Sequence, residues 1–126
     1  MNSTAKARAG YGADAAPART PRASEYDLIA RVTAQLKSAE AKGRDGFAEL
    51  VQAVHINQRL WTTLAIDVAS DTNALPDPLR ARIVYLADFT RQHSRKVLGR
   101  EAGIDPLVEI NTSVLRGLRG DTGAEA

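Results

Sequence analysis

Cysteine is absent from this chain of 126 residues, which excludes disulfide bonds, thiolate metal sites and a cysteine nucleophile. Aromatic residues make up only 5% of the sequence, so the core must be built mainly from aliphatic side chains and alanine. Long hydrophobic runs are also missing, and no segment approaches the roughly 20 apolar residues that span a bilayer. These absences predict a cytoplasmic protein without a membrane partner, with one modest core in a single domain.

The two ends of the chain differ in composition from the middle. Residues 1–27 contain no leucine, isoleucine, valine or phenylalanine, so the apolar centre of a signal peptide is missing. Residues 1–19 are rich in alanine, glycine and small polar residues and predict a mobile, flexible arm. Residues 120–126 predict a disordered tail. The folded domain is therefore expected within residues 20–119.

Apolar residues recur at three- and four-residue steps through this domain, which predicts helices and no strands. We expect the first helix to begin with Thr20 as N-cap and Pro21 at the first helical position. It should end before Gly43, because glycine is the usual residue just beyond a helix C-terminus. The second helix is predicted to run from about Gly46 to Ala69.

Two Asp-Pro pairs mark the starts of two further helices. Asp77 is predicted to cap the third helix, with Pro78 at its first position, and Asp105-Pro106 repeats the device before the fourth. The fourth helix is expected to end before Gly120. Short connections between four helices predict an all-α fold, a small antiparallel bundle.

The predicted third helix is apolar over more than one face. Its core stripe consists of Leu79, Ile83, Leu86, Ala87, Thr90 and Val97. Val84, Tyr85 and Phe89 widen this stripe. A helix that is apolar over so much of its circumference is either central in a bundle or contacts a partner. We therefore name Val84, Tyr85 and Phe89 as candidate walls of a partner-binding groove.

Polar residues interrupt the apolar stripes at Asn57 on the second helix and Asn111 on the fourth. Two interpretations are open: the asparagines form a buried pair that fixes the packing of the helices, or they bind a partner's backbone in a groove. Trp61, the only tryptophan, is either the main core aromatic or an interface anchor, since tryptophan is enriched at binding hot spots.

Positive charge gathers in residues 91–100, although the whole chain carries a net charge of only +2. Arg91, Arg95, Lys96 and Arg100 lie in this segment without an acidic residue. They are candidate phosphate contacts. The alternative is that these cations favour the C-terminus of a helix, where the backbone dipole is negative.

Residues of the kind that carry catalysis are sparse. His55 and His93 are the only histidines, and neither has a second metal ligand at helical spacing. The sequence contains neither a nucleophile motif nor a glycine-rich phosphate loop. We therefore predict a protein that is not an enzyme and uses no cofactor, metal or small-molecule substrate.

Several of these elements occur in an order that resembles the FlaF family, flagellar biosynthesis regulators of alphaproteobacteria. The resemblance covers about residues 11–118. It is carried by Tyr11, Pro21-Arg22-x-x-Glu25, Ala53-x-x-x-Asn57-x-x-x-Trp61, Asn73-x-Leu75-Pro76-x-x-Leu79-Arg80-Ala81-x-Ile83-x-x-Leu86, His93-Ser94-x-x-Val97 and Pro106-Leu107-x-x-Ile110-Asn111.

This resemblance implies a non-enzymatic factor for flagellin production and filament assembly. It also implies a companion regulator, FlbT, which acts post-transcriptionally on flagellin messenger RNA. Two mechanisms are open: a chaperone that binds flagellin before export, or a regulator of flagellin synthesis that acts through FlbT or the messenger. Flagellin is the favoured partner, because a bundle groove can hold its amphipathic terminal helices. Direct RNA binding is less favoured, because RNA readers stack bases on exposed aromatic side chains, which are few here.

Overall fold

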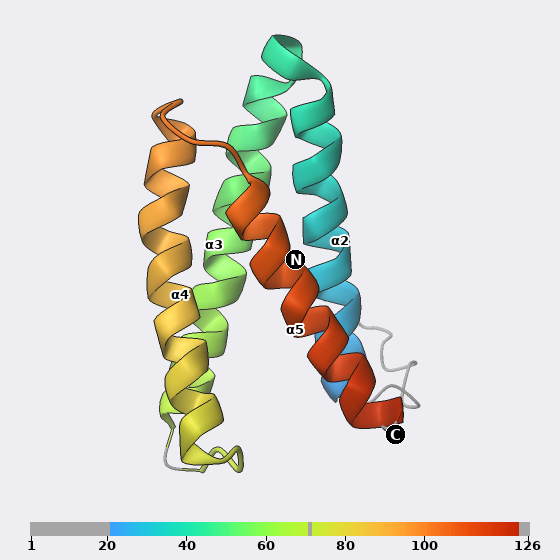
Figure 1. The fold of residues 1–126 in the computed structure, drawn as a ribbon, viewed down its shortest axis with the longest axis vertical. Coiled ribbons are helices and arrows are strands. Elements are labelled where there is room, and N and C mark those ends of the chain that lie inside the picture. Colours follow the sequence, from blue (N-terminus) through green and yellow to red (C-terminus); the bar gives the residue numbers. More distant parts are fainter. Residues whose placement is uncertain (1–20, 71, 124–126) are drawn as a thin grey trace, which may run out of the picture.

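A computed structural model describes residues 21–70 and 72–123, and this part of the chain is helical except at its turns and loops. The elements are α2 (Pro21–Ala41), the short 3-10 helix η1 (Gly43–Gly46), α3 (Phe47–Ala69), α4 (Asp77–Leu98) and α5 (Asp105–Gly123). Successive α-helices run in opposite directions (Figure 1). The predicted all-α antiparallel bundle is confirmed. The predicted arm, Thr20 and the last three residues lie outside the described residues.

The turn between α2 and α3 depends on two glycines. Gly43 has a φ of 63°, in the left-handed region that glycine enters without a steric penalty, so it ends α2 as predicted. Gly46 is buried, and a Cβ at this position would overlap the carbonyl oxygen of Ala39 and the Cβ of Lys42. Close approach of the two helices therefore excludes any side chain at Gly46.

The start of α4 differs by one residue from the prediction. The first helical hydrogen bond runs from the Arg80 N–H to the Pro76 carbonyl over 3.0 Å, so Pro76 occupies the cap position. Asp77 is already helical and makes no capping bond. Its exposed carboxylate lies 3.4 Å from an Arg80 guanidinium nitrogen instead. The prediction of Asp77 as N-cap was therefore wrong, whereas the proline-rich restart of the helix was right.

Side chains also close the connection between α3 and α4. Arg80 donates through Nε to the Val68 carbonyl over 2.7 Å and through Nη2 to the Ser70 carbonyl over 3.3 Å. These carbonyls belong to the end of α3, where backbone acceptors have no partner within the helix. The side-chain oxygen of Asn73 accepts the Leu75 N–H over 2.9 Å. The connection is therefore fixed by residues that begin the next helix.

The fourth predicted helix, α5, is longer than expected. It continues through Gly120 to Gly123, so the first four residues of the predicted tail, 120–123, are helical. A glycine inside a helix costs only about 1 kcal/mol relative to alanine. Because no proline follows Gly120, nothing in the sequence forces the helix to stop there.

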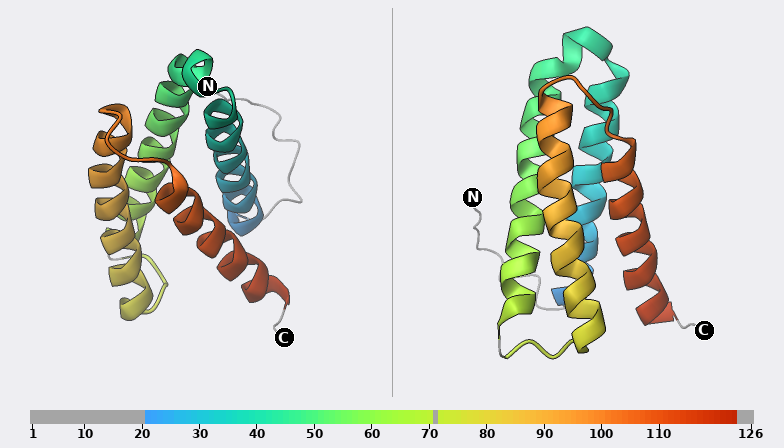
Figure 2. Two further views of the ribbon diagram at one scale, coloured as in Figure 1. Left: turned by 45° about the horizontal axis from the view of Figure 1, so that its top comes forward. Right: turned by 60° about the vertical axis from the view of Figure 1, so that its left-hand side comes forward.

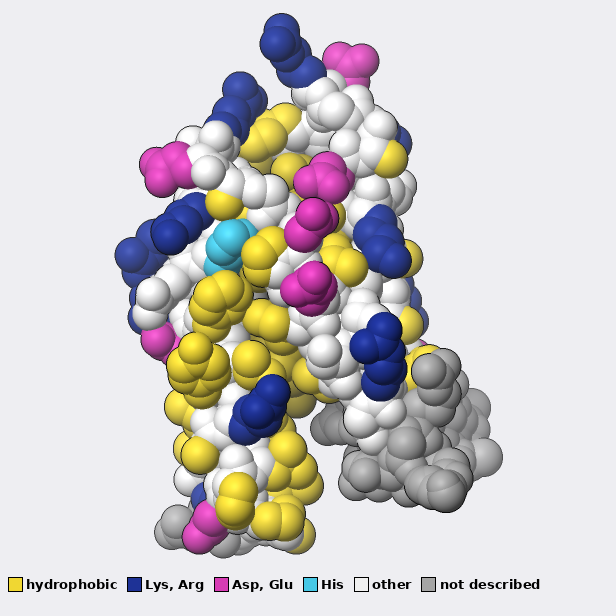
Figure 3. Space-filling view, viewed as in Figure 1, with side chains coloured by type: hydrophobic (Ala, Val, Ile, Leu, Met, Phe, Trp, Pro, Cys, Tyr) yellow, Lys and Arg dark blue, Asp and Glu magenta, His cyan; other side chains and the backbone are white. Residues whose placement is uncertain are grey.

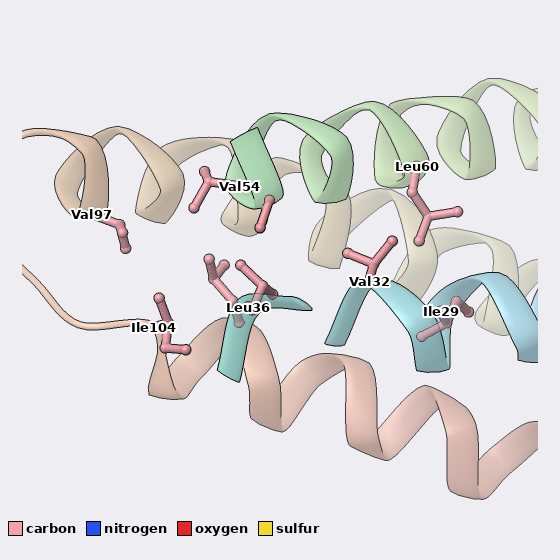
Figure 4. Packing of buried hydrophobic residues seen from close by; sticks show 9 residues of the cluster. Ile29, Val32, Leu36, Val54, Leu60, Val97 and Ile104 are labelled. Atoms are coloured by element: carbon pink, nitrogen blue, oxygen red, sulfur yellow. The ribbon is translucent and has the colours of Figure 1, made fainter. Parts of the chain in front are cut away.

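The helices pack unequally around one apolar core. The α3 helix contacts both α2 and α4, whereas α5 rests mainly on α2 and meets α4 less extensively. Two further views show α4 and α5 converging at their connecting loop and separating toward the opposite end (Figure 2). The buried cluster consists of Ile29, Val32, Leu36, Ala53, Val54, Leu60, Val97, Ile104 and Leu107 (Figure 4). None of the described helices is long and apolar enough to cross a membrane.

Candidate binding groove

An open groove borders the N-terminal half of α4, on the side where α5 diverges from it (Figure 1). The space-filling view shows the molecule hollowed beside this part of α4, where hydrophobic side chains gather (Figure 3). Antiparallel packing places the start of α2, the end of α3, the start of α4 and the end of α5 at this one end of the bundle (Figure 1). We call it the open end, and the end that carries η1 the closed end.

The core stripe of α4 loses its cover at the open end. Leu79 is 42% exposed, although Val97 on the same stripe is buried. On α2, Leu28 flanks the core stripe and is 39% exposed, whereas the adjacent stripe residue Ile29 is 1% exposed. The prediction that Leu79 is buried was therefore wrong. On α4 the sequence thus continues a bundle core that the described side chains do not cover.

Tyr85, Phe89 and His93 are the candidate residues for the α4 wall of the groove. These residues follow each other at four-residue steps, so they share one face of α4. The rings of Phe89 and His93 stack with their centroids 5.6 Å apart. His93 donates through Nε2 to the Gly103 carbonyl over 2.8 Å, because a carbonyl only accepts. This bond joins the face of α4 that carries His93 to the loop before α5. Tyr85, two turns earlier on that face, is 68% exposed.

Val84 does not belong to this wall. Successive residues of an α-helix are about 100° apart, which places Val84 about 140° from Phe89 around the axis. Its flank of α4 is that of Asp88 and Arg91, which form an exposed ion pair at 2.6 Å. Val84 is exposed, and its role in partner binding stays a prediction, although it lies on a different flank of α4 from Phe89.

A buried polar centre lies beside the groove, where α5 crosses α2 and α3. Asn111 accepts the Trp61 indole N–H at its Oδ1 over 2.9 Å. Its amide nitrogen donates to Asn57 Oδ1 over 2.8 Å and to Thr33 Oγ1 over 3.1 Å. Thr33 in turn donates to the Ile29 carbonyl over 2.7 Å. One side chain of α5 is thus bound to two residues of α3 and one of α2.

Burial decides between the two interpretations of these residues. Asn57 and Asn111 have no exposed surface, and Trp61 is 1% exposed. The buried asparagine pair is therefore confirmed, and Trp61 is a core aromatic. None of the three lies on a free surface, because the amide and indole hydrogen bonds require their side chains to converge inside the bundle. Their assignment as direct partner contacts is corrected accordingly.

Three polar atoms near the α3–α4 seam are buried without a hydrogen-bond partner among the described residues: Asn57 Nδ2, Thr90 Oγ1 and Ser94 Oγ. An unpaired buried polar group costs about 1–3 kcal/mol relative to a paired one. The packing of α4 against the rest of the bundle is therefore less stabilising at these three polar atoms than at the buried apolar side chains around them. The predicted core stripe included Thr90, which is buried as expected, whereas the burial of Ser94 was not predicted from the sequence.

The basic residues at the end of α4 separate into two places. Arg91, Arg95 and Lys96 line a shallow depression of about 670 Å³, which Glu101 also lines. Arg100 instead lies over the ring of Phe47, 4.0 Å from its centroid. Arg95 and Lys96 occupy the last turn of α4, which agrees with the interpretation that cations favour a helix C-terminus. The four residues therefore do not form one phosphate-binding patch.

The fold and the groove define a small antiparallel helical bundle that is closed at one end and open at the other. A sequence model of the family described as flagellar protein FlaF matches residues 7–118, which is most of the chain. This chain therefore belongs to the FlaF family of flagellar proteins. The comparisons with curated proteins and with solved structures returned no match.

Proposed function

We propose that this flagellar protein binds an amphipathic helix of flagellin in the open groove and acts as a chaperone before export. The supporting observation is the exposure of Leu79, at a position where the sequence continues the core stripe of α4, together with the exposure of Tyr85 on the same helix. Apolar side chains in this arrangement become buried when an added helix lies along the groove. The proposed role requires no catalytic group and no cofactor.

The dimensions of the groove suit a short helix. The α4 wall from Asp77 to Phe89 spans about 20 Å at about 1.5 Å per residue, which corresponds to between three and four turns. A helix of that length presents three or four apolar residues on one side, at the i, i+3, i+4 and i+7 spacing used in groove recognition. Tyr85 offers the partner a large apolar surface with a hydroxyl, a combination common at binding hot spots.

The second candidate function is post-transcriptional regulation of flagellin synthesis through FlbT or flagellin messenger RNA. The depression at Arg95 and Lys96 is the feature that favours it. Two observations weigh against direct RNA binding. Arg91 is held by Asp88, and Glu101 places a negative charge in the same depression. Tyr85 is also the only aromatic side chain in the described part of the chain that is mostly exposed, which leaves little surface for base stacking.

Calorimetric titration of the full chain with unpolymerised flagellin tests the proposal. We expect one-to-one binding at micromolar affinity or tighter, about −8 kcal/mol or more favourable. Tyr85→Ala should weaken binding by about tenfold or more, since truncation of a hot-spot residue costs about 2 kcal/mol. Ile66→Ala is the matched control, because Ile66 is 69% exposed and lies on α3 away from its buried face.

The same variants separate binding from folding. Tyr85→Ala should leave the thermal unfolding temperature nearly unchanged, since exposed positions usually contribute within about 0.5 kcal/mol. Phe89→Ala should lower it, because Phe89 is half-buried and stacked on His93. Equal flagellin affinity for wild type and Tyr85→Ala would remove the groove from the proposal. A different pair of results would favour regulation through RNA. The protein would not bind flagellin, and it would bind the messenger with an affinity that falls with salt and is lost in Arg95→Glu and Lys96→Glu.

A further inference from the structure

A second hollow lies at the closed end of the bundle, remote from the groove. It has a volume of about 280 Å³ and is enclosed by the end of α2, η1, the start of α3, the end of α4 and the loop that follows. Val97 and Ile104 are buried and belong to its lining, as do the half-buried Phe47 and Leu50. The pocket is therefore apolar on one side, although it opens on a polar end of the molecule.

Arg100 adopts a backbone conformation that is unfavourable for its residue type. Its φ is 61°, and it is the only non-glycine residue with a positive φ among the described residues. Gly99, directly before it, has an ordinary negative φ. The chain thus places arginine at the position where glycine would fit without strain. This conformation brings the Arg100 guanidinium over the ring of Phe47, at the pocket.

The charges around the pocket leave cationic donors free. Arg44 also lines it, and neither Arg44 nor Arg100 forms an ion pair within the described residues. Glu40 is the single acidic residue in the lining, so two cations face one anion. Guanidinium donors lie in the plane of the group, so a guanidinium placed over a ring can still bind a carboxylate. Hydrophobic side chains are visible between cationic ones at this end of the molecule (Figure 3).

An apolar surface beside two arginines selects the chemistry of a ligand. Inorganic phosphate would satisfy the guanidinium groups but would leave the apolar side of the pocket uncovered. A molecule that carries an apolar group and a carboxylate matches both parts, because arginine binds carboxylates through paired hydrogen bonds. The volume lies just below the roughly 300–1,000 Å³ range of pockets for drug-sized ligands. It suits a group of about the size of one amino-acid residue.

We propose that this pocket binds the carboxylate end of a partner polypeptide whose last side chain is apolar. The α5 helix runs from the closed end to the open end (Figure 1). Its 19 helical residues span about 28 Å. The pocket and the groove therefore lie at opposite ends of the bundle, and a polypeptide bound in one does not cover the other.

Short peptides test this proposal on the full chain by calorimetry or by chemical shifts in NMR spectra. The probes are a hexapeptide that ends in leucine with a free carboxylate, the same peptide with a C-terminal amide, and N-acetyl-leucine. The free acid is expected to bind, and the amide should bind about tenfold or more weakly, since hydrogen bonds to charged groups are strong. N-acetyl-leucine should also bind more weakly than the peptide, because it lacks the preceding backbone.

Arg100→Gly is the decisive variant. Glycine accepts the positive φ, so the fold should be retained while the guanidinium is lost. Affinity for the free acid should fall about tenfold or more, and Arg44→Gln should act in the same direction. Arg95→Gln is the matched control, because it removes one positive charge from the end of α4 outside the pocket lining.

Four results would overturn the proposal. The first is equal affinity for the acid and the amide, and the second is unchanged affinity for the acid in Arg100→Gly. The third is absence of binding at about 1 mM free acid, which corresponds to very weak affinity. The fourth is equal affinity for N-acetyl-leucine and the peptide. The last would identify a site for free small acids.

Discussion

The indole N–H of Trp61 donates to Oδ1 of Asn111 over 2.9 Å, and this bond joins α3 to α5 inside the bundle. The same Asn111 side chain donates to Asn57 on α3 and to Thr33 on α2. Since α5 meets α4 only sparingly, these bonds contribute much of what fixes the position of α5. The width of the groove between α4 and α5 therefore depends on side chains that do not line it.

Replacement of Asn111 by alanine should destabilise the protein strongly. The change leaves the Trp61 N–H and Asn57 Oδ1 buried without partners, at about 1–3 kcal/mol for each group. We expect the free energy of unfolding to fall by about 2–4 kcal/mol in urea denaturation. A double-mutant cycle with Trp61→Phe should give a coupling energy of about 0.5–3 kcal/mol. A coupling near zero would show that the two residues act independently.

Replacement of Arg80 by glutamine should loosen the connection between α3 and α4. Its guanidinium binds the Val68 and Ser70 carbonyls and is only 26% exposed, so solvent replaces these bonds poorly. We expect a loss of about 1–3 kcal/mol in the free energy of unfolding. Hydrogen exchange should accelerate at the end of α3. Arg82→Gln, two residues away on an exposed position, is the control and should change little.

Replacement of Thr90 by valine should be neutral or stabilising, by up to about 1 kcal/mol. The Thr90 hydroxyl is buried without a hydrogen-bond partner among the described residues. A methyl group of similar size in its place removes the free-energy cost of burying an unpaired polar group. Thr33→Val is the matched comparison, because the Thr33 hydroxyl donates to Ile29 and accepts from Asn111. It should lower the unfolding temperature. Equal destabilisation by both changes would mean that the Thr90 hydroxyl is hydrogen-bonded in solution.

Two substitutions at Arg100 should differ in stability. Arg100→Ala keeps the unfavourable φ and loses the contact with Phe47, whereas Arg100→Gly loses the contact but relieves the strain. A left-handed conformation costs about 1–2 kcal/mol in a residue with a Cβ, and an exposed cation–π contact contributes about 0.5–1 kcal/mol. We expect the glycine variant to unfold at the higher temperature. The opposite order would indicate that φ at this position is relaxed in solution.

The fold was largely predictable because its signals are local. Gly43 stops α2 through its own backbone freedom, and the Asp-Pro pairs begin α4 and α5 through fixed proline torsions. Helix ends were less predictable where a distant partner decides them. Pro76 rather than Asp77 caps α4 through the Arg80 N–H, and the Arg80 side chain binds the end of α3. The second contact depends on how the two helices meet, which the sequence does not show.

The candidate site was predictable only in part. The polar interruptions at Asn57 and Asn111 correctly marked a special place in the core, but their spacing along the chain could not show that they bind each other. Val84 was grouped with Tyr85 because both are apolar, although the helix turns them to different flanks. The exposure of Leu79 had no signal in the sequence, since its stripe has the spacing of an ordinary buried helix face.

Uneven packing along the axis also has a consequence for motion. At the closed end, Leu36, Val54 and Leu107 are completely covered, and amides beside them should exchange only when the whole chain unfolds. At the open end Leu79 and Tyr85 are exposed among the described residues of α4, so we expect local opening of this part of α4 to need less free energy. A ligand in the groove would therefore raise local protection at the start of α4 and the end of α5 before it changed the rest of the protein.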